Sequence, residues 1–144
     1  MREAWARKCV CLMDLRPNNW YINRAKLDSV REAWQRGEQS KLPPVDVANI
    51  DGVLSLIDGH SRAFAALERG ESHIEANVST LEGIEGSTAL YRHIHKQGPA
   101  LGIETIADLR DRIIEPEEHA RLWVRYCTEW LEAHRSVETK EDPA

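Results

Sequence analysis

Long hydrophobic runs are missing from this sequence of 144 residues: the longest apolar stretches, residues 9–13 and 63–67, hold five residues each. A helix that crosses a bilayer needs about 20 consecutive apolar residues, and a signal peptide needs an apolar core of its own. The sequence therefore predicts neither a membrane span nor a signal peptide, and we expect no membrane partner.

Cysteine is scarce as well. The chain has three, Cys9, Cys11 and Cys127, which is an odd number without a Cys-x-x-Cys pair. Disulfide frameworks use even sets in oxidising compartments, so we expect no such framework and a location in the reducing cytoplasm. Cys9 and Cys11 would share one face of a strand, where we expect small buried hydrophobic residues.

An excess of basic charge is also lacking. The net charge of −5 comes from 24 acidic and 19 basic residues, and it is unevenly spread. Residues 1–42 carry 9 bases and 5 acids, residues 43–85 carry 2 and 8, and residues 86–144 carry 8 and 11. Proteins that bind a nucleic-acid backbone present a basic surface, so nucleic acid is disfavoured as a partner. The basic first third can still face one anionic ligand.

The patterns that are present predict strands and helices in the first half of the chain. In order, we expect a strand over residues 9–14, a helix from the cap Asn23 to about Arg36, a hairpin of residues 45–48 and 53–57 around Asp51-Gly52, a helix from Ser61 to Gly70 and a strand over residues 74–79. This order of elements indicates an α/β (α+β) fold with a mixed sheet.

The second half has a helical pattern. The expected helix starts are, in order, Ser87 or Thr88, Thr105 with Asp108 in a capping box, and Pro116. We expect residues 1–82 to form the α/β domain, residues 83–136 a helical extension of about three helices packed on it, and residues 137–144 a flexible tail. The apolar side of the last helix would cover the domain or pair with a second copy in a homodimer.

One segment carries the residue types of an active site. Asp58, Gly59, His60, Ser61 and Arg62 follow a predicted strand and open a predicted helix. Free amides at a helix start bind anions, and Gly59 would let a ligand approach the backbone closely. Arg62 could hold phosphate oxygens, while Asp58 or His60 could hold a metal ion or move a proton. Spacing alone leaves the plainer alternative open, in which this is a turn with a capping histidine and a surface arginine.

The chain resembles the ParB/sulfiredoxin-like superfamily of small nucleotide-binding α/β domains. The resemblance rests on Leu-Met-Asp-Leu-Arg-Pro-Asn at residues 12–18, Lys26-Leu27, Leu-Pro-Pro-Val-Asp-Val at residues 42–47, and Leu-Ile-Asp-Gly-His-Ser-Arg-Ala at residues 56–63. It covers roughly residues 9–79 and implies a ParB/sulfiredoxin-like domain with a mixed sheet.

Single residues separate the branches of this superfamily. A sulfiredoxin carries a cysteine directly before its histidine, where this chain has Gly59. A partition ParB continues into a basic DNA-binding domain, whereas the rest of this chain is acidic. The free serine kinases look closest, because their Asp-Gly-His-Thr-Arg element differs mainly at Ser61. That likeness implies phosphate binding by Gly59, His60, Ser61 and Arg62, with Asp58 near a metal or the acceptor hydroxyl, and with ATP or ADP, or CTP, and Mg²⁺ as cofactors.

One departure bears on catalysis. The kinases place a catalytic glutamate after the entry proline, whereas Asn18, Asn19 and the residues up to Asn23 include no acid. An asparagine amide cannot act as a general base near neutral pH. We therefore expect a nucleotide-binding enzyme that transfers phosphate to a small hydroxyl metabolite through Asp58 or His60. The alternatives are a non-catalytic nucleotide-binding regulator and a ParB-like DNA-associated accessory protein.

Two other groups of residues are candidate sites. Trp20 and Tyr21 border the expected nucleotide site, where packing is favoured over stacking on a ligand. His93 and His95 are two apart on a predicted helix, so their side chains diverge and a shared metal is disfavoured.

Overall fold

The computed structural model describes residues 5–135, and its centre is a mixed sheet. The strands are β1 (Ala6–Cys11), β2 (Arg16–Pro17), β4 (Val45–Ile50), β5 (Val53–Asp58) and β6 (His73–Thr80), in the order β1-β6-β4-β5-β2. The pairs β1·β6 and β4·β5 are antiparallel, while β4·β6 and β2·β5 are parallel. The predicted mixed α/β fold is confirmed.

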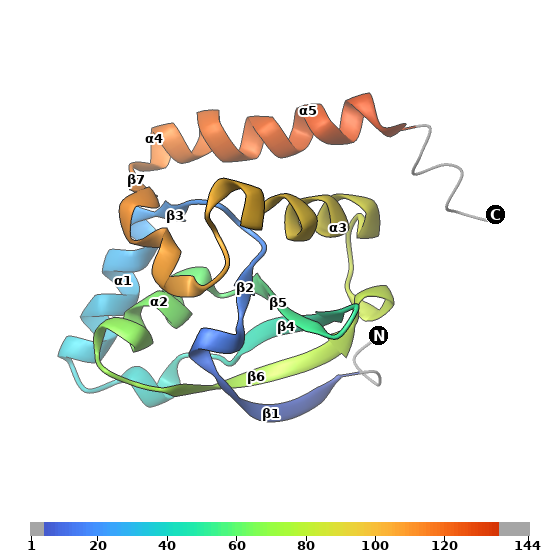
Figure 1. Cartoon of the computed structure of the whole chain (residues 1–144). Helices are drawn as coiled ribbons and strands as arrows, with labels where there is room; N and C mark the ends of the chain where they lie inside the picture. The colour runs from blue at the N-terminus through green and yellow to red at the C-terminus, as the bar shows by residue number, and fades with distance from the viewer. Residues whose placement is uncertain (1–4, 136–144) are drawn as a thin grey trace.

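The helices lie outside this sheet (Figure 1). They are α1 (Arg24–Gln35), α2 (His60–Glu68), α3 (Thr88–Gln97), α4 (Pro116–His119) and α5 (Arg125–Ala133). Figure 1 shows α1 and α2 side by side, and α5 running along the outer side of α3, away from the sheet. A π-helical turn, Ala120–Val124, joins α4 to α5, so the last helix begins at Pro116 as predicted.

Local signals in the sequence set several boundaries. The Asn23 side chain accepts hydrogen bonds from the amides of Ala25 and Lys26 and caps α1. Asp51 and Gly52 both have positive φ angles, 52° and 89°, as a two-residue hairpin turn requires. The capping box of Thr105 and Asp108 is present, but the segment after it, Ile106–Arg112, is a 3₁₀ helix.

Two expectations about β1 are wrong. The strand ends at Cys11 because the next three residues, Leu12–Asp14, form a 3₁₀ turn. Cys9 is exposed and Cys11 half-buried, whereas Val10 is buried. The core lies on the Val10 side of this edge strand, and the opposite face at Cys9 is uncovered.

A short parallel pair ties the two halves of the chain together. β3 (Ile22–Asn23) pairs with β7 (Ile113–Ile114), and the Arg24 guanidinium contacts the Glu115 carboxylate at 2.7 Å. This pairing holds the start of α4 beside the start of α1.

The main core contains side chains from both halves. Leu12, Leu56 and Phe64 belong to the same buried cluster as Ile94 and Trp123.

No helix within residues 5–135 is long and apolar enough to cross a membrane. The predicted tail, residues 137–144, lies outside the described residues.

Candidate functional site

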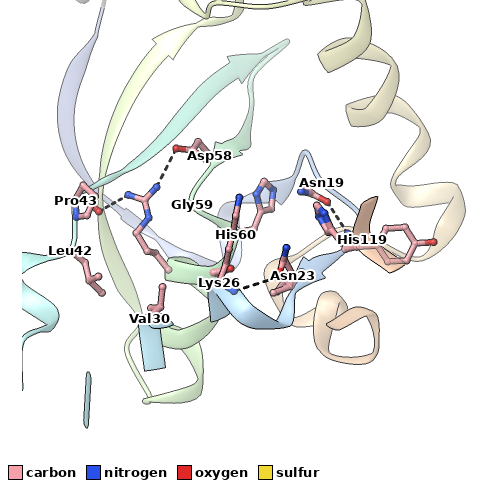
Figure 2. Close-up of a pocket in the computed structure, with 14 residues that line it drawn as sticks. Asn19, Asn23, Lys26, Val30, Leu42, Pro43, Asp58, Gly59, His60 and His119 are labelled. Carbon is pink, nitrogen blue, oxygen red and sulfur yellow. Dashed lines mark hydrogen bonds and ion pairs between the residues drawn. The ribbon is translucent and has the colours of Figure 1, made fainter. Parts of the chain in front are cut away.

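A hollow of about 390 Å³ opens where α1 and α2 begin (Figure 2). Its lining comes from five parts of the chain: Asn19, Tyr21, Ile22 and Asn23; Lys26 and Val30 of α1; Leu42 and Pro43; Asp58 to Arg62; and His119 of α4. All five residues of the predicted anion site therefore line one hollow. The volume is in the range of small-molecule sites.

Gly59 is the residue that allows the turn from β5 into α2. Its φ angle is +104°, a conformation that favours glycine. A Cβ atom at this position would lie 2.5 Å from Cγ1 of Val45. The glycine is thus needed for packing within the fold, a role that its place in the sequence did not indicate. The amides of His60, Ser61 and Arg62 form the first turn of α2 and therefore have no acceptor within the helix, and Gly59 has no side chain to cap them.

Arg62 already has several hydrogen-bond partners. One guanidinium nitrogen donates to the carbonyl oxygens of Pro43 and Pro44, each at 2.8 Å. The other donates to the Asp58 carboxylate at 3.2 Å. The side chain is 16% exposed. Arg62 therefore fixes the Pro43–Pro44 connector to the end of β5, which leaves two of its five N–H groups for any ligand.

Asp58 is the exposed carboxylate of the site, with 72% of its side chain accessible. One oxygen accepts from Arg62, and no described residue donates to the other. Asp58 also borders a second hollow, of about 530 Å³, next to Asp46 and Tyr91. Within residues 5–135 no group of three or more His, Cys, Asp or Glu could hold a metal ion alone.

His60 is buried and already engaged. Its Nε2 accepts a hydrogen bond from the amide of Asn18 at 3.1 Å. Burial, helped by the charge of Arg62, lowers the pKa of His60 to about 3. The ring is therefore neutral at pH 7, and the proton lies on Nδ1 because Nε2 acts as an acceptor.

Asn18 lies in the loop that lacks the expected acid, and it has a structural role. Its side-chain nitrogen donates to Ser55 Oγ and to the carbonyl of Tyr91, both at 2.9 Å. Together with the bond to His60, these contacts hold the loop after β2 against β5, α2 and α3. An asparagine after a proline is ordinary in a loop, so the sequence did not indicate this network.

Lys26 and His119 are the cationic or titratable residues that were missed as site residues. Lys26 follows the cap Asn23 by three residues, so its place in the first turn of α1 could have been found from the capping pattern. No hydrogen bond or ion pair of its ammonium group is present within residues 5–135. His119 is separated from the motif by more than fifty residues, and nothing in the sequence pointed to it.

Trp20 and Tyr21 lie in different surroundings. Trp20 is buried and packs against Trp123 and Tyr126, which confirms that packing decides its position. Tyr21 lines the hollow, and the Arg112 guanidinium lies 5.3 Å from the centre of its ring.

His95 is buried beside Arg16, whose guanidinium lies 3.2 Å from His95 Nε2. His93 forms its hydrogen bond with the Tyr126 hydroxyl, at 2.7 Å, so the two histidines have different partners.

No protein-family profile and no curated protein matches this chain. Among solved structures, the chain is similar to protein Atu1540 from Agrobacterium tumefaciens, with 18% identity, a TM-score of 0.48, and coverage of 73% of this chain and 62% of that one. It is also similar to sulfiredoxin from Arabidopsis thaliana, with 18% identity, a TM-score of 0.42, and coverage of 60% and 96%. The chain thus spans less than two thirds of Atu1540.

Proposed function

We propose that the hollow between α1 and α2 binds the phosphate groups of a nucleotide, and that the chain transfers a phosphate from ATP or ADP to a small hydroxyl metabolite. The main support for this proposal is that three features suited to binding phosphate and its metal lie at one hollow. These are the uncapped start of α2, the ammonium of Lys26 and the exposed carboxylate of Asp58. Each would serve a different part of the same ligand.

The start of α2 and Lys26 suit the phosphates. Free amides at a helix start carry partial positive charge and donate directly to phosphate oxygens. Lys26 lies on the first turn of α1 and adds a full positive charge to the same hollow. Tyr21, Val30 and Leu42 add apolar surface on which the rest of a nucleotide could lie.

Asp58 suits the metal. Mg²⁺ is usually held by one or two carboxylates together with substrate phosphates and water, so a single carboxylate is a sufficient protein contribution. When bound, Mg²⁺ would offset the charge of the phosphates. Asp58 has one oxygen without a partner among the described residues, which is the atom that would face the ion or the acceptor hydroxyl.

The transfer step has a simple balance. The acceptor oxygen forms a bond to the terminal phosphorus, and the bond from that phosphorus to the bridging oxygen breaks, which releases ADP from ATP or AMP from ADP. When the free oxygen of Asp58 faces the acceptor, the hydroxyl proton goes to Asp58, and Mg²⁺ would then be held by the phosphates and water. His60 is the weaker candidate for moving this proton, because its ring is neutral, buried and bonded to Asn18.

The second candidate function is a nucleotide-binding regulator without catalysis. One observation favours it: the loop after Pro17 supplies amides in place of an acid, and the Asn18 amide is bound within the fold. Asp58 would then contact nucleotide or metal without activating an acceptor.

The test begins with calorimetry of ATP, ADP and CTP in the presence of Mg²⁺. Phosphate transfer from ATP and ADP is then measured across serine, threonine and related hydroxyl compounds. We expect Asp58→Asn to lower turnover by roughly 10² or more, with a much smaller change in nucleotide affinity, because the amide can neither accept the proton nor hold Mg²⁺ as well. Asp111→Asn, at an exposed position outside the hollow, is the matched control.

The outcomes separate the two functions. Tight nucleotide binding without transfer to any acceptor supports the regulator. Transfer that survives Asp58→Asn removes Asp58 as the catalytic group. Failure of all three nucleotides to bind overturns both functions.

A further inference from the structure

The second half of the chain contributes a side chain to the hollow. Strand β7 pairs with β3 at the edge of the hollow, and the Arg24–Glu115 ion pair fixes the start of α4 there. Pro116 occupies the first helical position of α4, and His119 follows one turn later. In Figure 2 the labelled residues run from Pro43 at one end to His119 at the other, with Gly59, His60 and Lys26 between them.

The His119 ring is available to a ligand. Its backbone amide bonds to the carbonyl of Glu115, but no described residue forms a hydrogen bond with the ring. The residue is half-buried at the wall of the hollow. His60, the other histidine of the hollow, already has its Nε2 occupied. His119 is therefore the imidazole of this hollow that can donate to a ligand.

The charged groups in and beside the hollow come from three helices. Arg24 of α1 is paired with Glu115, Arg62 of α2 is paired with Asp58, and Glu118 of α4 lies 3.8 Å from Arg121. Among the lysine, arginine and acidic residues that line the hollow, Asp58 and Arg62 are paired with each other, and Lys26 has no ion-pair partner within residues 5–135. The side chains that line the hollow thus leave the positive charge of Lys26 unbalanced.

We propose that His119 is a ligand-binding residue of this hollow and that it takes up a proton when a phosphate group binds between it and Lys26. The inference rests on the proposed nucleotide binding, and it adds a residue from the C-terminal helices to that site. It also predicts which ligand is preferred: a phosphate carrying two negative charges, which Lys26 and a protonated His119 would balance.

The direction of the proton uptake follows from the surroundings. Burial and the positive charge of Lys26 both lower the pKa of His119, which favours the neutral ring near pH 7. A bound phosphate supplies negative charge beside the ring and offsets Lys26, which raises the pKa again. Binding and protonation therefore favour each other, and affinity should rise as the pH falls.

The experiment measures binding of MgADP by calorimetry at pH 6, 7 and 8. The wild-type protein should bind about three- to tenfold more tightly at pH 6 than His119→Gln does, with a smaller difference at pH 8. The titration of ADP itself is the same for both proteins, so the difference between them isolates His119. His119→Arg, which keeps a charge at every pH, should bind well and lose this pH dependence. His73→Gln, at an exposed position on β6, is the control.

A second measurement observes the ring directly. In proton NMR spectra, the titration midpoint of the His119 ring should move to higher pH when the protein is saturated with MgADP. If MgADP binds but the midpoint does not move, and His119→Gln binds like the wild type at every pH, this inference is wrong while the proposed function stands. If the wild type binds no MgADP at any of the three pH values, this inference is wrong, and the proposed function is wrong as well if ATP and CTP with Mg²⁺ also fail to bind.

Discussion

Single residues of the site have two kinds of role, and Arg62 illustrates the difference. Its position in the motif indicated a fork for phosphate oxygens. In the structure the same fork donates to the carbonyls of Pro43 and Pro44 and to Asp58. Charged hydrogen bonds to groups inside a protein stabilise the fold by about 1.5–3 kcal/mol, because the acceptors would otherwise lose their partners. Arg62 thus shapes the hollow whether or not it touches a ligand.

Arg62→Ala tests this at the scale of one residue. We expect the free energy of unfolding to fall by about 2 kcal/mol, since two carbonyl oxygens lose a charged donor. MgADP affinity should fall as well, because Asp58 and the connector lose their fixed positions. Urea unfolding and calorimetry on the same preparation measure the two effects. Arg125→Ala, an exposed residue of α5, is the control. A loss of affinity with unchanged stability would show instead that Arg62 acts mainly on phosphate.

At the scale of elements, the last helix depends on a stack of aromatic rings. The Trp130 ring lies 4.9 Å from that of His93 on α3 and 4.0 Å from that of His134, nearly parallel to both. Trp130 is only half-buried, so its packing covers the outer layer of the core. Such stacking adds to the area that each ring removes from water.

Trp130→Ala should destabilise the fold by about 3 kcal/mol, because α5 would lose its main ring contact with α3. MgADP affinity should stay near the wild-type value, because Trp130 lies outside the hollow. Chemical unfolding followed by calorimetry checks both statements. A loss of binding with intact stability would place the boundary between scaffold and site elsewhere. A change of sedimentation velocity would show in addition that α5 joins two copies.

Elements with several turns or several alternating residues could be predicted, and very short ones could not. The caps Asn23 and Ser87 mark the starts of α1 and α3 in the sequence as in the structure. Strands β2, β3 and β7 contain two residues each, which is too short for any periodic pattern. Because β3 and β7 together bring α4 to the hollow, the position of His119 in its lining could not be predicted either.

At the scale of the whole molecule, a buried polar layer joins segments from both halves. Asn18 connects the loop after β2 to His60 on α2, to Ser55 on β5 and to the Tyr91 carbonyl on α3. Arg16 on β2 donates to His95 on α3. The sequence predicted the motif around His60 but not this layer, since its members are spread over eighty residues and each looks like an ordinary loop or helix residue.

The two buried histidines make the stability of the whole fold sensitive to acid. Burial lowers the pKa of His60 to about 3, and burial together with Arg16 lowers that of His95 to about 4. In the unfolded chain both would titrate near 6.5. Below pH 6.5 the unfolded state therefore binds protons that the folded state does not bind. The free energy of unfolding falls as the pH falls, until the pKa values of the folded state are reached.

This loss can be separated from the titration of carboxylates. Between pH 7 and pH 5 each buried histidine should lower the free energy of unfolding by about 2 kcal/mol, whereas most carboxylates bind protons only below this range. Urea unfolding at pH 7, 6 and 5 gives the slope. In His60→Gln the amide oxygen can still accept the Asn18 N–H bond, so this variant should lose about half as much stability over the same range. A wild-type stability that stays constant from pH 7 to pH 5 would mean that water reaches these rings and that the polar layer is open to solvent.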